Sequence, residues 1–181
     1  NGEKIGSTEY GYCGFDCDVT QKLKYGEDNL LAVYTNTGVP EGSRWYTGGG
    51  INRDVRIIVK DTMSMSRHGV YVVAEKARDD NWIVRVQAEL PGALLQKGKV
   101  EFQANIFDAG GKKVTSSKMT SAPAKSRLHL YEVDLDPMTV TSPRLWQVVS
   151  PESGDQKSNL YTCEVVMYVD GKPTDRISER F

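Results

Sequence analysis

The 181 residues of the chain carry 23 basic and 24 acidic side chains, which leaves a formal net charge of −1. This balance excludes the strong positive field with which proteins bind nucleic acid or anionic membranes, so we expect neither partner. Hydrophobic residues make up 39% of the chain and charged residues 26%, as in ordinary globular proteins that bury a core without disulfides or metal ions. No run of 18 apolar residues spans a bilayer, and the turn-like start Asn1-Gly2 suggests a cut inside a larger protein.

Alternating apolar and polar residues predict β-strands from the beginning of the chain. In the first 60 residues we predict strands over Gly14–Val19, Leu30–Thr35 and Val55–Lys60. Thr20–Tyr25 is the one stretch suited to a short helical turn, with Thr20 as its N-cap. Three strands leave one apolar face uncovered, so this part either belongs to a larger β-domain or packs against the rest of the chain.

The stretch GSRWYTGGGINRDVRI, which begins at Gly42, places three glycines beside a basic and aromatic cluster. Phosphate-binding glycine loops are followed by a helix, whereas an alternating strand pattern follows Gly48–Gly50, so we interpret the glycines as a tight bend. Aromatic faces stack on sugar rings and guanidinium groups hydrogen-bond hydroxyls. Arg44, Trp45 and Tyr46 are therefore the candidate substrate-binding residues, while Arg53 and Asp54 better suit an ion pair or an interface.

A domain boundary is predicted near Lys60–Arg67, where the segment KDTMSMSR offers no apolar anchor except two methionines. Seven strands then follow at the spacing of an immunoglobulin-like sandwich, and the pair Asp170-Gly171 is the strongest hairpin signal in the chain. We therefore predict an all-β protein with domains at residues 1–60 and 61–181. The predicted strands of the second domain are Val70–Glu75, Trp82–Leu90, Val100–Phe107, Val114–Thr120, Leu128–Leu135, Tyr161–Val169 and Thr174–Arg180.

The three cysteines are predicted to be free thiols. Cys13 and Cys17 are four residues apart in a predicted strand, about 13 Å and too far for a disulfide. The spacing of Tyr161 and Cys163 mimics the tyrosine corner of antibody domains, but neither the partner cysteine nor the core tryptophan of those domains is present. Cys163 is therefore expected to be a small core residue. The thiols fit either the cytoplasm or the periplasm of a bacterium.

Acidic and histidine residues provide no recognisable catalytic motif. Glycosidases need two carboxyl groups across the scissile bond, but paired acids at alternate strand positions are usually a solvated face. We interpret Asp16 with Asp18, Asp134 with Asp136, and Glu89 with Glu101 in this way. His68 and His129 are isolated in the sequence and lack a nucleophile motif. We therefore expect no catalytic residue, no metal site and no cofactor in this chain.

Three motifs in order resemble glycoside hydrolase family 2, the β-galactosidase and β-glucuronidase family. SRWYTGGGINRDV resembles the motif that ends the family's sugar-binding jelly-roll domain, and YGYCGFDCDVTQKLKYGEDNLLAVYTN resembles the strands before it. SNLYTCEVVMYVDGKPTDRISERF resembles the last hairpin of the immunoglobulin-like middle domain, although the preceding SPRLWQVVSPESGDQKSNLY is longer than the family's usual segment. The resemblance covers essentially the whole chain.

The resemblance implies that the chain is a piece of a β-galactosidase-like enzyme that hydrolyses terminal β-galactosides with retention. The family's two catalytic glutamates lie in a barrel of about 250 residues, for which this chain has no room. The piece would be scaffold beside that barrel, with Arg44, Trp45 and Tyr46 at the edge of the carbohydrate pocket.

Two other classes of function stay open at this point. One is a stand-alone carbohydrate-binding or adhesin-like module, for which Trp82, Trp146 and Tyr131 would form the platform, although each is expected in the core. The other is an oligomerisation domain, because the unpaired edges of the partial jelly roll favour a homo-oligomer.

Overall fold

The computed structural model describes residues 1–36, 38, 49–123, 129–147 and 159–181. The chain divides into two compact units, residues 1–58 and 59–181, and each is described by itself. Within the described residues, no helix has both the length and the apolar character needed to cross a membrane.

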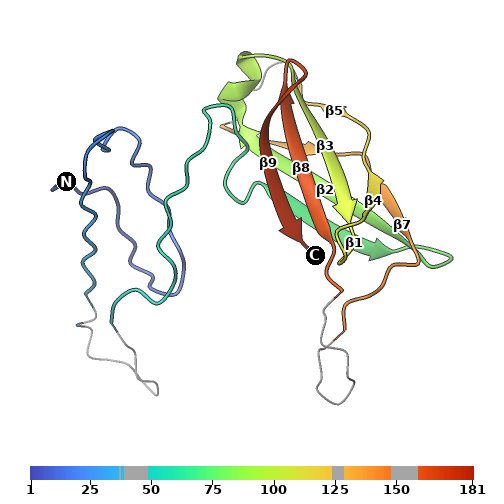
Figure 1. The fold of residues 1–181 in the computed structure, drawn as a ribbon, viewed down its shortest axis with the longest axis horizontal. Coiled ribbons are helices and arrows are strands. Elements are labelled where there is room, and N and C mark those ends of the chain that lie inside the picture. Colours follow the sequence, from blue (N-terminus) through green and yellow to red (C-terminus); the bar gives the residue numbers. More distant parts are fainter. Residues whose placement is uncertain (37, 39–48, 124–128, 148–158) are drawn as a thin grey trace. The chain divides into compact units, whose positions relative to one another are not determined.

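The second unit is an antiparallel β-sandwich, which confirms the predicted all-β fold (Figure 1). Two sheets lie face to face, and their inward side chains form one apolar cluster. The elements in chain order are β1 (Val70–Lys76), β2 (Asn81–Pro91), the 3₁₀ helix η1 (Gly92–Gln96), β3 (Val100–Phe107), β4 (Lys113–Ser116), β5 (Thr120–Ser121), β6 (Leu130–Asp134), β7 (Met138–Thr141), β8 (Thr162–Val169) and β9 (Lys172–Arg180).

The first sheet is organised by β2, its longest strand. One edge of β2 pairs along its length with β1, from Lys76 opposite Trp82 to Val70 opposite Ala88. The other edge pairs with β7 near its start and with β6 near its end. β2 thus holds the whole first sheet together.

The second sheet has the order β4-β3-β8-β9, and β5 also pairs with β3. The β8–β9 hairpin turns at Asp170 and Gly171, with φ of 49° and 77°. Both residues therefore lie in the left-handed region that a tight two-residue hairpin turn requires, which confirms the predicted turn.

The core lies between the sheets and follows the period-2 alternation of the strands. Phe102 of β3, Leu90 of β2 and Met167 of β8 are completely covered, as is Cys163, which confirms that this cysteine is a core residue. All three cysteines are free thiols. Every residue of the core cluster belongs to the second unit, so this unit contains the apolar burial that stabilises the described chain.

The predicted and observed strands of the second unit differ in three places. The strand predicted over Val114–Thr120 is two short strands, because the Ser117 hydroxyl accepts the Ala104 N–H at 3.0 Å and replaces a ladder bond there. β7 was not predicted, although Met138 and Val140 lie at alternate positions and are buried. The helix η1 was not predicted either, because its buried Leu94 and Leu95 are adjacent and do not alternate as in a strand. The β3 prediction matches both observed bounds.

The three strands predicted in the first unit were wrong as paired strands. Its described residues contain no strand ladder, so the extended segments have no strand partner in the described residues of the unit. The predicted helical turn is present, since Leu23 donates to the Val19 carbonyl at 3.1 Å. The side chain that caps this turn is Asp18 and not Thr20 as predicted, since the Asp18 Oδ1 accepts the Thr20 N–H at 2.9 Å.

The KYGEDN turn of the first unit is organised by Asn29. Its amide Nδ2 donates to the carbonyls of Lys24 and Glu27 at 2.9 and 3.0 Å, and its Oδ1 accepts the Lys24 N–H at 2.9 Å. Gly26 supplies the left-handed backbone of the turn, with φ of 78°. Local hydrogen bonds therefore shape this unit more than apolar burial does.

Replacing Phe102 with alanine should lower the free energy of unfolding by about 3–5 kcal/mol, because it leaves a cavity in the sandwich core. Urea unfolding followed by tryptophan fluorescence measures the change. The matched control is Tyr71→Ala, since the Tyr71 side chain is 66% exposed, and it should change stability by about 0.5 kcal/mol or less. Equal losses in the two variants would contradict the assignment of the core.

Two of the three thiols should react with a thiol reagent in the native chain. Burial raises the pKa of Cys163 to about 12, and the thiolate is the reactive form, so this thiol is protected both sterically and chemically. A timed titration with Ellman's reagent should count two thiols before unfolding and three after it. In a Cys163→Ala variant the late reaction should disappear, whereas three equally fast thiols in the native chain would contradict the buried position.

Candidate functional site

The candidate sugar-binding residues Arg44, Trp45 and Tyr46 lie outside the described residues, so their role stays a prediction. The end of the neighbouring glycine run is described. Gly50 lies in a bend with φ of 106°, as the bend interpretation requires, and both Gly49 and Gly50 are exposed. No helix follows among the described residues 49–60, so the run lacks the helix N-terminus on which phosphate loops depend.

The predicted ion-pair role of Asp54 is confirmed, with Arg56 rather than Arg53 as the partner. The Arg56 Nη2 donates to the Asp54 Oδ2 at 2.6 Å, and both side chains are well exposed. Exposed pairs of this kind contribute little to stability, so this one is a solvated surface contact.

The acidic pair Asp16 and Asp18 is exposed, as predicted for a solvated face. Hydrogen bonding by Thr20 holds the pKa of Asp18 below its usual range. The pair Asp134 and Asp136 is also exposed, and Asp134 accepts a hydrogen bond from the Gln87 amide at 3.0 Å. The carboxylates of Asp18 and Asp134 are thus hydrogen-bond acceptors at the surface.

The third acidic pair is divided between the two sheets, because Glu89 lies in β2 and Glu101 in β3. Glu101 forms an ion pair with the Lys99 ammonium at 2.7 Å and accepts a hydrogen bond from the Ser121 hydroxyl at 3.1 Å. The hydrogen bond from Lys99 is the main reason why the pKa of Glu101 is lowered. A general acid needs a raised pKa, so Glu101 is suited to pairing with Lys99 rather than to proton donation.

Both histidines are exposed and lie in separate segments, as predicted. His68 precedes β1 with φ of 56°, and His129 precedes β6. Among the described residues, no three His, Cys, Asp or Glu side chains gather as a metal site would need.

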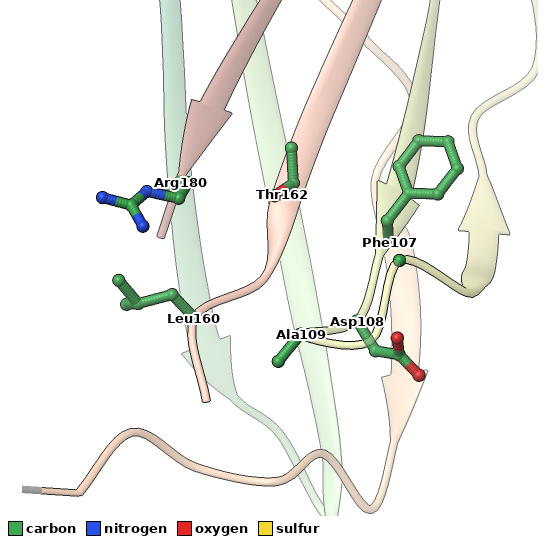
Figure 2. Close-up of a pocket in the computed structure, with 7 residues that line it drawn as sticks. Phe107, Asp108, Ala109, Leu160, Thr162 and Arg180 are labelled. Carbon is green, nitrogen blue, oxygen red and sulfur yellow. The ribbon is translucent and has the colours of Figure 1, made fainter. Parts of the chain in front are cut away.

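A hollow of about 340 Å³ opens at the end of the second sheet, between the β3–β4 turn and the last residues of the chain. Figure 2 shows the Asp108 carboxylate and the Arg180 guanidinium on opposite sides of it, with Leu160 and Ala109 between them. The Asp108 Oδ1 already accepts the N–H groups of Gly110 and Lys112, each at 2.9 Å, because it closes the turn. The Asp108 carboxylate thus has a structural role in the turn beside this hollow. The hollow is lined by Phe107, Asp108, Ala109, Gly111, Leu160, Thr162 and Arg180.

The three aromatic residues considered as a binding platform lie in different environments. Tyr131 packs against the core and Trp82 is half-buried, so neither ring is fully exposed. The expectation of a core position was wrong for Trp146, whose side chain is 58% exposed. Residue type alone does not show which neighbours cover a ring.

The segment that carries Trp146 is held by two hydrogen bonds. The Arg144 N–H donates to the Tyr161 hydroxyl at 3.1 Å, and the Asn159 amide donates to the Leu145 carbonyl at 3.1 Å. Tyr161 thus bonds an upstream backbone group, as in a tyrosine corner, but as an acceptor and from a residue 17 positions away.

Large apolar side chains are exposed along the first unit, both within the segments predicted as strands and outside them. They have no cover from a second apolar layer among the described residues of the unit, and a homo-oligomer formed through them stays a prediction. The exposed side chains are Ile5, Tyr10, Tyr12, Phe15, Tyr25, Leu30, Leu31, Val33, Tyr34, Ile51, Val55, Ile57 and Ile58.

Proteins with known sequences and structures match the chain along most of its length. The β-galactosidase BoGH2A of Bacteroides ovatus is 27% identical over 151 residues, which are 83% of this chain and 17% of that protein. A β-glucuronidase of Bacteroides fragilis is 27% identical over 99% of this chain and 26% of its own length. The chain therefore spans between about a sixth and a quarter of these relatives.

A solved structure extends the similarity to both units. The crystal structure of a glycosyl hydrolase family 2 member from Bacteroides cellulosilyticus DSM 14838 matches 98% of this chain and 23% of its own, with a TM-score of 0.77 and 26% identity. The model of the family described as glycosyl hydrolases family 2 matches residues 68–181, which contain all nine strands described above. This match covers more than half of the sequence, and the chain belongs to glycosyl hydrolases family 2.

Proposed function

We propose that this chain is a non-catalytic scaffold segment of a family 2 glycosidase. The observation that carries the proposal is the family match over residues 68–181, whose described strands form a β-sandwich and not a barrel. A retaining glycosidase needs two carboxyl groups about 5–5.5 Å apart, one of them with a raised pKa. The acids singled out from the sequence are instead exposed, or divided between the two sheets, and the pKa shifts of Asp18 and Glu101 are downward.

The intact enzyme is proposed to hydrolyse terminal β-galactosides by a retaining mechanism, with its two catalytic carboxylates in a barrel domain of the same polypeptide. The similarity to a protein named β-galactosidase supports the galactoside, and the similarity to a protein named β-glucuronidase supplies the competing substrate. In this arrangement residues 1–60 end a sugar-binding jelly roll and residues 61–181 form an immunoglobulin-like middle domain.

A stand-alone carbohydrate-binding module is the second candidate function. The exposed ring of Trp146 favours it, since stacking of a sugar on an aromatic face requires a free face. A millimolar or tighter affinity of this chain for galactose, measured by calorimetry, would support the module. Loss of that affinity in Trp146→Ala would assign it to this ring.

Hydrolysis tests distinguish the scaffold from a catalytic domain. The chain should release no nitrophenol from p-nitrophenyl β-D-galactoside or p-nitrophenyl β-D-glucuronide, whereas the complete gene product should cleave the galactoside. If the complete protein cleaves only the glucuronide, the proposed galactoside substrate is wrong and the substrate is a β-glucuronide. Hydrolysis by this chain alone would contradict the scaffold proposal.

Replacing Trp45 with alanine in the complete enzyme should raise KM about tenfold and leave kcat nearly unchanged. A ring that edges the pocket contributes equally to binding of the substrate and the transition state, which affects KM alone. Tyr71→Ala is the control, because it removes an exposed aromatic ring to which neither candidate function assigns a sugar contact, and both kinetic constants should be kept. An unchanged KM in Trp45→Ala would remove this residue from the pocket.

A further inference from the structure

The segment Lys60–Arg67, which lies shortly before β1, was predicted to be a domain boundary with no apolar anchor except two methionines. The structure shows that one of its methionines is an anchor. Met65 is 1% exposed and belongs to the apolar core of the sandwich, and the half-buried Met63 packs against the same cluster. A free linker would keep both side chains in water, so these residues are docked onto the second unit.

Asp175 of β9 ties this segment to the second sheet. Its Oδ2 accepts the Met65 N–H at 2.8 Å and lies 3.4 Å from the Lys60 ammonium, which also donates to the Met65 carbonyl at 2.9 Å. The Asp175 side chain is only 15% exposed. Because a half-buried carboxylate is costly without partners, the bonds from residues 60–65 stabilise Asp175 as much as Asp175 holds them.

The position of Asp175 follows from an irregularity in β9. The β8–β9 register shifts at this point, so that Tyr168 lies opposite Pro173 and Met167 lies opposite Asp175. Residues opposite each other in an antiparallel pair share one face of the sheet, and the Met167 side chain is fully buried. The carboxylate is therefore directed toward the inner side of the sandwich, where Met65 enters.

The same segment is also bonded to the first sheet. The Ser66 N–H donates to the Glu89 carbonyl at 2.9 Å, and the Glu89 N–H donates to the Gly69 carbonyl at 2.7 Å. A Cβ on Gly69 would lie 2.7 Å from the Ser66 carbonyl oxygen and 2.8 Å from that of Glu89, closer than a carbon can approach. Only glycine allows this contact with β2.

We propose that residues 60–69 form a strap that fastens the two sheets of the sandwich to each other, and that Asp175 is the residue that positions it. The strap reaches β9 through Asp175, β2 through Glu89 and the core through Met65. It makes the rigid part of the second unit begin at Lys60 rather than at β1. This inference concerns the chain itself and does not depend on the proposed glycosidase function.

Limited trypsin digestion of the 181-residue chain tests the strap, because Lys60 and Arg67 are trypsin sites within it. Cleavage after Lys60 requires the strap to detach, so it should be slow in the unaltered chain. Asp175→Ala removes the acceptor of the Met65 N–H and the partner of Lys60, and it should accelerate this cleavage about tenfold or more. Gly69→Ala should accelerate it as well, by the clash with β2.

Two further variants serve as a control and as an intermediate case in the digestion experiment. Ser66→Ala is the matched control, since the buried Ser66 hydroxyl has no hydrogen-bond partner among the described residues and its removal should leave the cleavage rate unchanged. Asp175→Asn keeps an oxygen that accepts the Met65 N–H but loses the charge, so its rate should lie between those of the unaltered chain and Asp175→Ala.

Hydrogen exchange of the unaltered chain keeps the proposal testable even where Asp175→Ala fails to fold. The amides of Met65, Ser66 and Gly69 should exchange about a hundredfold or more slowly relative to an unstructured peptide, because each donates a bond in the strap. Unprotected amides at these positions would overturn the proposal. Cleavage after Lys60 that is equally fast in the unaltered chain and Asp175→Ala would also overturn it.

Discussion

Burial of one apolar cluster between two sheets is the constraint on which the described structure depends. Val84, Val86, Ala88 and Leu90 face inward from β2 at every second position, and they meet Phe102 across the sandwich within one cluster. Since β2 pairs with three other strands, this alternation fixes the register of the entire first sheet. Side chains that do not face the core can then be polar. Glu101 pairs with Lys99 and Glu164 pairs with Arg176 in the second sheet.

The first unit shows what happens to similar sequence patterns without such a cluster. Leu30 to Tyr34 and Val55 to Ile58 have the apolar content of strands, but these residues are exposed and no ladder pairs them within the described chain. The local order of this unit comes from the Asn29 hydrogen bonds and the left-handed Gly26. A family 2 crystal structure nevertheless matches 98% of the chain, so the backbone path of the family is present along both units.

The sequence patterns predicted the sandwich well because β2 alternates from Val84 to Leu90 and because β3 and β8 alternate over part of their length. The bounds of β3 and the hairpin at Asp170 followed directly from alternation and turn chemistry. Strand pairing in the first unit was not predictable from pattern, since a strand also requires a neighbour. The packing of Met65 into the core was not predicted, because a flexible methionine in a polar segment resembles linker sequence. The exposure of Trp146 depends on tertiary neighbours, and the predicted sugar contacts at Arg44 to Tyr46 lie outside the described residues.

The apolar core that stabilises the described part of the chain lies within residues 59–181, so these residues should be as stable alone as in the whole chain. Urea unfolding of residues 59–181 alone, compared with that of the whole chain, tests it most directly. We expect both proteins to unfold in a single cooperative transition at the same urea concentration. A shortened chain that is unfolded in water, or whose midpoint is clearly lower, would contradict it.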